Sequence, residues 1–347
     1  MNKTELIKMA LRLRVAEPWL ILDDAMVFGV KLPDEEIAYC CVMGHNGEHY
    51  GLAVYVGTLG LTHFINQLRG AALGYVSPLA IRSINCDFEK ASDTNLSKTE
   101  KEEVRRIAKE SGIGLKRSQG YPEFICYDGG RVMEELDERS SDQLYAAMRA
   151  TVTLSDMIRK MTEFELKLRG FDRGDTYPYP WGGKLIPLLT PRSDGGYDWT
   201  TMRTPAALDP SEMAIPLSEA ARKELDPLPR LGVYECRAVS LPASLKIEGG
   251  VLYPPMLMVI ERLSGMIMPI KFTDNGGDKG LADLLDNYVE ALRERGSLPA
   301  QIVFDDPVTE RVLADLCRQL GIRLEKVDEL PNLDDAFDFM VREFMSH

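Results

Sequence analysis

One pattern of residues occurs twice along this chain of 347 residues, and this internal repeat constrains the fold more than any other feature. The first copy has an apolar run in Ser77–Asp87, then a charged helical stretch that ends at Gly112-Ile113. The second has a similar run in Ser297–Asp306, then a helical stretch that ends at Gly321-Ile322. A short strand and a proline follow in both copies. Because such a repeat usually marks a repeated structural unit, the sequence predicts two α/β domains of related build.

Apolar periodicity predicts the same order of elements in both copies: three strands, then helix, strand, helix, strand and helix. An amphipathic helix, Lys3–Arg14, precedes the first copy. The predicted fold class is therefore α/β (α+β, with mixed sheets), in two related βββαβαβα domains. In the first copy the strands are 25–32, 37–44, 48–56, 80–86 and 123–127, and the helices are 61–69, 98–111 and 141–168. In the second copy the strands are 232–239, 256–263, 266–272, 301–304 and 323–327, and the helices are 281–295, 309–320 and 333–344.

The two copies set the predicted domain limits, with an N-terminal domain at 1–169 and a C-terminal domain at 231–347. The segment between them, 170–230, is rich in proline and contains Trp181 and Trp199. Proline favours an irregular connector, but disordered linkers are poor in aromatic residues. We therefore expect an ordered connector whose tryptophans pack between the domains or face a ligand.

Composition narrows the class of protein. Apolar residues make up 45% and charged residues 27% of the chain, which is typical of a soluble globular protein. The net charge of −13 argues against nucleic acid as a general partner, because phosphate binding needs clustered lysine and arginine. No secretory segment or membrane-spanning apolar run is apparent, and the six cysteines form no CxxC pair. We expect a cytoplasmic, bacterial-type protein with reduced cysteines and no membrane partner.

Two histidines and a glutamate lie close together at His45, Glu48 and His49, a grouping that can bind metal. The Asn46-Gly47 pair between two predicted strands is typical of a two-residue type I′ turn. In such a hairpin His45 faces Glu48, and side-chain alternation puts His45 and His49 on opposite faces. The sequence therefore predicts a tight turn with a His45–Glu48 pair and no metal site. These three residues remain candidates for binding a partner.

The element order of the second copy is that of the ribonuclease H-like fold. The segments Met258–Ile267 and Leu298–Asp306 resemble an integrase-type core of that superfamily. This resemblance implies three acids that hold two Mg²⁺ or Mn²⁺ ions for phosphodiester cleavage. One acid lies on the first strand, one at the end of the fourth strand and one on a later helix. The candidate acids are Glu235, Asp305 or Asp306, and Asp338 or Glu343.

These acids match the catalytic pattern incompletely. Glu235 stands where the superfamily usually has aspartate, and the candidates on the last helix are out of register by a few residues. The run Asp305-Asp306-Pro307 also fits a strand end followed by a helix N-cap, with proline at the first helical position. The glycine-rich run Asp274–Gly280 precedes a helix, but it matches no phosphate-binding motif and its aspartates would repel phosphate. The sequence predicts an ordinary loop there.

Two parts of the chain resemble a family of uncharacterised bacterial two-domain proteins. The segment Tyr39–Tyr55, with its Gly47-Glu48-His49 turn, is similar to the N-terminal domain of that family. The stretch Pro255–Phe344 is similar to its second domain of unknown function. The resemblance implies an identity without an activity, and it marks the Gly-Glu-His turn as a feature of the family.

The leading functional hypothesis is a non-catalytic binding or assembly module with a degenerate ribonuclease H-like fold. The first alternative is a phosphodiester-cleaving enzyme, which would require Mg²⁺ or Mn²⁺; the other two hypotheses require no cofactor. The second alternative is a small-molecule sensor with a site between the domains near Trp181 and Trp199. The expected partner is accordingly a protein or a small molecule.

Overall fold

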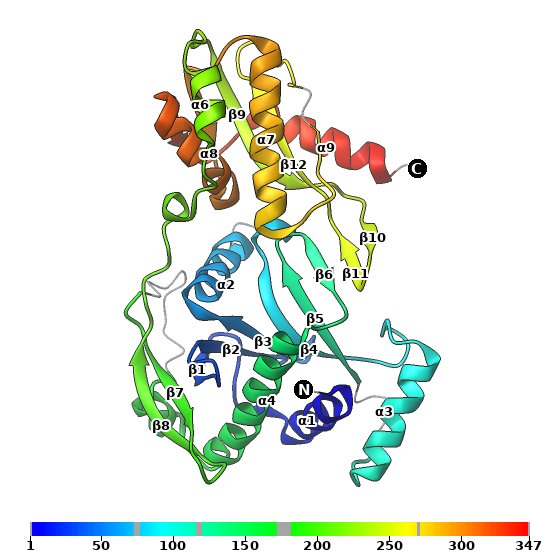
Figure 1. The fold of residues 1–347 in the computed structure, drawn as a ribbon. Helices are drawn as coiled ribbons and strands as arrows, with labels where there is room; N and C mark the ends of the chain where they lie inside the picture. The colour runs from blue at the N-terminus through cyan, green and yellow to red at the C-terminus, as the bar shows by residue number, and fades with distance from the viewer. Residues whose placement is uncertain (1, 73–76, 116–119, 172–181, 269–270, 346–347) are drawn as a thin grey trace. The chain divides into compact units, whose positions relative to one another are not determined.

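Two compact units make up the computed structural model, which describes residues 2–72, 77–115, 120–171, 182–268 and 271–345 (Figure 1). Unit 1 consists of residues 1–69, 82–127 and 133–207. Unit 2 consists of residues 70–81, 128–132 and 208–347. None of the helices in the described ranges is both long and apolar enough to span a membrane.

The strands of unit 1 follow one another in the sheet in the order β5-β4-β3-β2-β1-β7-β8. Neighbouring strands are antiparallel from β1 to β4 and in the β7–β8 hairpin, whereas β1 and β7 are parallel. The strands are β1 (Phe28–Lys31), β2 (Ile37–Met43), β3 (Tyr50–Val56), β4 (Arg82–Glu89), β5 (Tyr121–Asp128), β7 (Leu185–Pro191) and β8 (Tyr197–Arg203). The helices are α1 (Lys3–Ala16), α2 (Gly57–Ala72), α3 (Lys98–Glu110), α4 (Glu138–Ile158) and α5 (Glu163–Leu168), with a 3₁₀ turn η1 (Pro18–Leu20).

Alternating side chains divide the sheet of unit 1 into two faces. Leu52 and Val54 of β3 belong to the main core, to which α1 and α4 contribute. Ala53 and Tyr55 point to the other face, where they pack with α2. A smaller apolar cluster joins α1 to α3. Each face is therefore covered by helices. Two polar residues of β4, Asn85 and Asp87, are nevertheless buried on the α2 face.

Unit 2 is built on a four-stranded sheet in the order β12-β9-β13-β14. Strand β12 is antiparallel to β9, whereas β13 is parallel to both β9 and β14. Helices α6, α7 and α8 cover one face of this sheet, and α9 covers the other. The strands are β9 (Val233–Ser240), β10 (Leu245–Ile247), β11 (Gly250–Leu252), β12 (Pro255–Glu261), β13 (Gln301–Phe304) and β14 (Arg323–Lys326), with the short β6 (Arg131–Met133) at the unit boundary. The helices are α6 (Glu219–Leu225), α7 (Gly277–Arg295), α8 (Pro307–Leu320) and α9 (Pro331–Met345), with 3₁₀ turns η2 (Pro78–Ala80) and η4 (Pro210–Met213).

The predicted α/β class with mixed sheets is confirmed, but a common build of the two domains is not. In unit 1 the strand after α2, β4, pairs antiparallel with β3. In unit 2 the strand after α7, β13, pairs parallel with β9. The difference has a steric cause, because the outer edge of β1 is occupied by β7 and is closed to β4. The ribonuclease H-like assignment of unit 2 stays a prediction.

Two predictions about individual segments need correction. The predicted strand 266–272 contributes, within the described residues, an isolated bridge between Ile260 and Ile267 rather than a named strand. The connector at 170–230 was expected to be irregular, but it contains the β7–β8 hairpin and α6. Pro187 and Pro191 lie within β7 and conceal the strand, because proline is rare inside sheets. The structure assigns residues up to 207 to unit 1 and those from 208 to unit 2, and the domain limits drawn from the sequence stay predictions.

The two units do share one local feature, a glycine in the first turn of the helix that follows the hairpin strands. A Cβ atom on Gly60 of α2 would lie 2.7 Å from the carbonyl carbon of Tyr55. A Cβ atom on Gly280 of α7 would collide with the carbonyl oxygen of Asn275. In both units the helix therefore starts so close to the preceding backbone that only glycine fits.

The close approach at Gly60 gives a first prediction. We expect Gly60→Ala to lower the free energy of unfolding by about 1–3 kcal/mol, because the collision outweighs the higher helix propensity of alanine. Urea unfolding followed by tryptophan fluorescence measures this, since Trp19 is buried in the core of unit 1. Gly114→Ala is the matched control, because a Cβ atom there meets nothing within 4 Å. Equal stability of the two variants would contradict the steric explanation.

Candidate functional site

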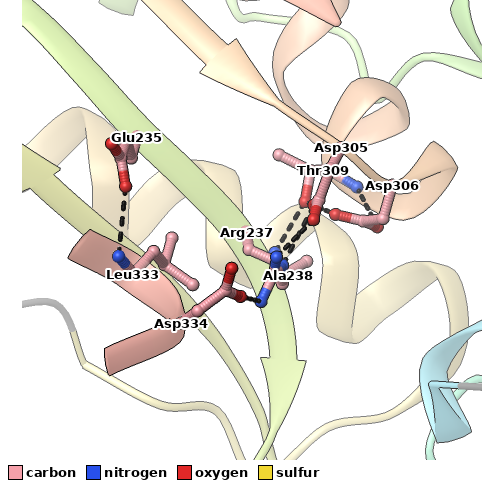
Figure 2. A network of polar contacts seen from close by, with 8 residues as sticks. All are labelled: Glu235, Arg237, Ala238, Asp305, Asp306, Thr309, Leu333 and Asp334. Atoms are coloured by element: carbon pink, nitrogen blue, oxygen red, sulfur yellow. Dashed lines mark hydrogen bonds and ion pairs between the residues drawn. The ribbon is translucent and has the colours of Figure 1, made fainter. Parts of the chain in front are cut away.

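Glu235 of β9 is fully buried and lies at the start of α9 (Figure 2). Its carboxylate accepts a hydrogen bond from the backbone N–H of Leu333 at 3.1 Å and one from the side-chain amide of Asn332 at 3.2 Å. The Nε atom of Arg262 lies 3.5 Å from the same carboxylate. The first N–H groups of a helix have no partner within the helix, and an anion there is favoured. The Glu235 carboxylate on β9 thus accepts a hydrogen bond from a backbone N–H at the start of α9 that has no partner within the helix.

Arg237, two residues after Glu235 on β9, lies between two aspartates (Figure 2). Asp305 directly follows β13, and Asp334 is in the first turn of α9. Its guanidinium donates to both oxygens of Asp305 and, at 2.7 Å, to Asp334 in the first turn of α9. Burial disfavours the charged guanidinium, but the hydrogen bonds and charges of Asp305 and Asp334 outweigh this effect and raise the pKa of Arg237. An arginine therefore occupies the space between these two carboxylates.

Asp306 has a different role from its neighbour, because it caps the N-terminus of α8. One carboxylate oxygen accepts the N–H groups of Val308 and Thr309, both at 2.9 Å, and the other accepts the Thr309 hydroxyl. The Thr309 oxygen in turn accepts the N–H of Ala238 at 2.6 Å, which links α8 to β9. Burial raises the pKa of Asp306 to about 6, against the lowering effect of these hydrogen bonds. The N-cap interpretation of Asp306-Pro307 thus agrees with the geometry.

The two candidate acids further along α9 do not join this network. Asp338 and Glu343 are exposed, and the backbone carbonyl of Asp338 accepts a hydrogen bond from the Arg342 side chain. The acid of α9 that meets Asp305 through Arg237 is Asp334, one helical turn before Asp338. Sequence reasoning missed this role of Asp334. The signal that could have revealed it is the four-residue spacing between Asp334 and Asp338, which places both side chains on the same side of the helix.

The network as a whole links two helices to the central strand of the sheet. Glu235 and Arg237 hold the start of α9, and Asp306 and Thr309 hold the start of α8. Within the described ranges, no group of three or more histidine, cysteine, aspartate or glutamate residues is arranged to hold a metal ion. These carboxylates are bonded to Arg237, to the Asn332 amide and to N–H groups at the starts of α8 and α9.

The hairpin between β2 and β3 differs from the predicted two-residue turn. Met43 pairs with Gly51, and a turn closed by a hydrogen bond from the Gly47 N–H to the Gly44 carbonyl lies between them. Positive φ occurs at Gly44 and Gly47 but not at Asn46, so the turn is not of type I′. The loop is longer than predicted, and the described side chains of His45 and Glu48 do not form the expected pair. Instead, the ring Nδ1 of His45 lies 2.9 Å from the Trp19 carbonyl oxygen, and Glu48 is exposed.

His49, at the other end of this turn, stands between two carboxylates of β4. Its Nε2 atom lies 3.4 Å from Asp87 and its Nδ1 atom lies 3.4 Å from Glu89. The interaction with Asp87, together with the charge of Glu89, raises the pKa of His49 against the effect of burial. The two histidines of the hairpin therefore have separate partners, and His49 is the one with acidic neighbours.

The described aromatic residues of the predicted connector, Phe171, Tyr197 and Trp199, lie within unit 1. Trp199 of β8 packs edge-on against Phe171, with their ring centroids 5.9 Å apart, and the Arg169 guanidinium lies over its ring. Trp181 lies outside the described residues. Tyr197, two residues before Trp199, lines a hollow of about 850 Å³ with side chains of α4 and Pro191. The tryptophan on β8 thus contributes to the unit's own core.

The glycine-rich run before α7 is a closely packed loop. A Cβ atom on Gly277 would lie 2.7 Å from a carboxylate oxygen of Asp128, and Gly277 has a φ of +62°. The N–H of Gly277 donates to the carbonyl of Gly129. The first backbone N–H of this helix is therefore already bonded within the protein.

The raised pKa of Asp306 predicts how stability depends on pH. Because the folded-state value near 6 exceeds the unfolded value of 3.8, the folded state holds a proton more tightly. The contribution of Asp306 to stability is complete below pH 4 and declines as pH rises through 6, by up to about 3 kcal/mol. Asp306→Asn keeps the N-cap acceptor but does not titrate. We expect the wild type to lose stability relative to this variant between pH 4 and 7.

Urea unfolding followed by circular dichroism measures this difference. Circular dichroism is used instead of tryptophan fluorescence because all three tryptophans precede residue 208, where the main segment of unit 2 begins. Asp137→Asn is the control. Asp137 caps α4, and the backbone hydrogen bond from Ser140 lowers its pKa, so its contribution should grow with pH rather than decline. A wild-type to Asp306→Asn difference that is constant over this range would show that Asp306 does not titrate there.

Two family models match separate parts of the chain. Residues 4–171 match the model described as Domain of unknown function (DUF7309). Residues 222–341 match the model described as Domain of unknown function (DUF6930). No curated protein and no solved structure gave a significant match. The resemblance to uncharacterised two-domain proteins is thereby confirmed: the two models together cover most of the chain, with one domain of unknown function matched in each part.

Proposed function

We propose that this protein is a non-catalytic binding or assembly module whose C-terminal unit has a degenerate ribonuclease H-like sheet. Support comes first from the strand arrangement, in which β12 is antiparallel to β9 while β13 and β14 continue parallel to β9. In that fold the catalytic acids lie on the strand corresponding to β9, at the end of the strand corresponding to β13, and on a later helix. Under this proposal Glu235, Asp305 and the α9 residue Asp334 correspond to these positions.

The single observation that carries the proposal is the position of Arg237. Its guanidinium bonds both Asp305 and Asp334, with only 15% of its side chain exposed. A divalent ion at these carboxylates would have to lie beside a buried positive charge, which is electrostatically unfavourable. Glu235 is also directed to backbone and amide N–H groups rather than to Asp305. The acids thus support the fold, and binding of a partner would use the surface that they hold in place.

The proposal predicts the sign of a stability change. Removing an acid from an active site usually stabilises a protein, because such sites hold unfavourable charges. Here we expect Asp305→Asn and Asp334→Asn each to lower the free energy of unfolding by about 1–3 kcal/mol, because Arg237 loses a charged partner. Asp338→Asn, an exposed change on the same helix, should stay within about 0.5 kcal/mol of the wild type. Urea unfolding followed by circular dichroism compares the three variants.

The rival function, Mg²⁺- or Mn²⁺-dependent phosphodiester cleavage, is tested with the same proteins. Saturable Mg²⁺ binding by the wild type in calorimetry, lost in Asp305→Asn, would overturn the proposal, particularly if the wild type also cleaved a nucleic-acid substrate. Stabilisation of the protein by Asp305→Asn would point the same way. Light scattering of the wild type then tests the assembly part of the proposal, since a concentration-dependent mass shows self-association.

A second candidate function, small-molecule binding, is favoured by the hollow in unit 1. Its volume of about 850 Å³ is in the range of ligand sites, and Tyr145, Tyr197 and Pro191 form apolar walls. The charged residues that line it include Lys31 and Arg149 and also the acids Asp34, Asp137, Glu138 and Asp142. This site lies within one unit and is therefore distinct from the inter-domain site expected from the sequence.

Filling the hollow tests this candidate. Ala146 lines it, so Ala146→Trp should block a ligand. In a thermal-shift screen with mixtures of small molecules, a true ligand should raise the Tm of the wild type and leave that of Ala146→Trp unchanged. A ligand that raises both Tm values equally binds elsewhere and contradicts this candidate.

A further inference from the structure

One edge of the sheet in unit 1 is formed by β8, a strand of seven residues at the end of the strand order (Figure 1). It pairs along its whole length with β7. In the described part of the chain no strand is bonded to its other side. An edge strand presents backbone N–H and C=O groups that can pair with a strand of another chain. The outer side of β8 is therefore a surface on which a partner strand can be added.

A proline in β7 shows which residues of β8 point their backbone groups outward. Pro187 stands opposite Thr201. Opposed residues on antiparallel strands alternate between hydrogen-bonded and non-hydrogen-bonded pairs, and proline has no N–H to donate. Five residues further along β7, at the opposite phase of this alternation, the N–H of Arg192 donates to the carbonyl of Gly196. The backbone groups that point away from β7 are therefore those of Tyr197, Trp199, Thr201 and Arg203.

This edge lacks the features that usually prevent strands from pairing with other molecules. Such edges are commonly short, interrupted by a bulge, or protected by proline or lysine. Strand β8 contains neither residue, and its register with β7 is unbroken. Its two charged residues, Asp198 and Arg203, cancel each other. In a chain with a net charge of −13, a locally neutral surface is where a second copy can approach with least repulsion.

An apolar surface lies beside this edge. The side chains of Phe164 and Leu168 on α5 are 69% and 68% exposed, and their four-residue spacing puts them on one side of the helix. The residue that follows α5, Arg169, places its guanidinium over the ring of Trp199 in β8. The end of α5 therefore lies next to β8. Large apolar side chains exposed beside an unpaired strand are typical of an interaction surface.

We propose that β8 pairs antiparallel with β8 of a second copy of this chain, so that the sheet of unit 1 continues across a two-fold axis. Full overlap of the two strands puts Thr200 on the axis and Trp199 opposite Thr201 of the second copy. The Asp198 end of each strand then meets the Arg203 end of the other, whereas parallel pairing would bring like charges together. This inference rests on the assembly part of the proposed function and names its partner.

A charge exchange at the axis tests the proposal with the full chain. The side chain of Thr200 is exposed, so substitution leaves the core intact. Thr200→Lys and Thr200→Glu each put like charges opposite one another and should raise the dimer dissociation constant about fivefold. An equimolar mixture of the two variants should restore dimerisation, because the charges are then opposite. Sedimentation equilibrium of each variant and of the mixture at low salt measures these constants.

A backbone substitution gives a second, independent test. Thr201→Pro removes an N–H that points outward and no hydrogen bond to β7, and proline is tolerated at such edge positions. We expect its dimer dissociation constant to rise about fivefold or more, because two bonds across the axis are lost. Thr201→Val is the matched control, since it keeps the N–H and should dimerise as the wild type does. Circular dichroism establishes that both variants are folded.

Two results would overturn the inference. The first is a wild-type mass of one chain at submillimolar concentration. The second is a dimer whose dissociation constant is the same in the wild type, the two Thr200 variants and Thr201→Pro, because the copies would then meet at another surface. Neither result alters the stability changes expected for Asp305→Asn and Asp334→Asn, so failure here is distinguishable from failure of the proposed function.

Discussion

The structure of unit 2 depends on the pairing of two buried charged side chains of β9, Glu235 and Arg237. Glu235 and Arg237 lie on β9, between β12 and β13 in the sheet, on the face that α9 covers. Burial of a charge is unfavourable unless partners compensate it. Glu235 finds its partners at the start of α9, and Arg237 finds them at the end of β13 and in the first turn of α9. The placement of α9 on the sheet thus depends on ion pairing as well as on its apolar side chains.

This arrangement also bears on function. The carboxyl ends of parallel strands are a common location for ligand sites in α/β proteins, and β13 ends at this network beside the middle of β9. Here the acids at that location are bonded to an arginine and to helix N-termini. Unit 1 presents the opposite case, since Asp87 and Glu89 share one half-exposed histidine. The acids in unit 2 are thus held by an arginine and by helix N-termini, whereas those of unit 1 contact a histidine that solvent can reach.

Much of the secondary structure could be predicted from the sequence, but the arrangement of the strands could not. The alternation of apolar residues identified β2, β3 and β13 nearly to the residue, because each strand buries one or both faces. The order of strands in unit 1 depended on β7, whose prolines concealed it and which occupies the edge of β1. The turn after Met43 was predicted too short, because the Asn-Gly signal identifies a hairpin without setting its register.

The sequence by itself determined the features that depend on neighbours within a few residues. These include the Asp306 cap of α8 and the glycines that begin α2 and α7. Only the tertiary structure decided which distant groups meet: that Asp334 rather than Asp338 reaches Arg237, and that His49 lies beside Asp87. The physical reason is that local geometry follows from bond lengths and helix or strand periods. Contacts between distant segments depend instead on sheet register and on which edges are free.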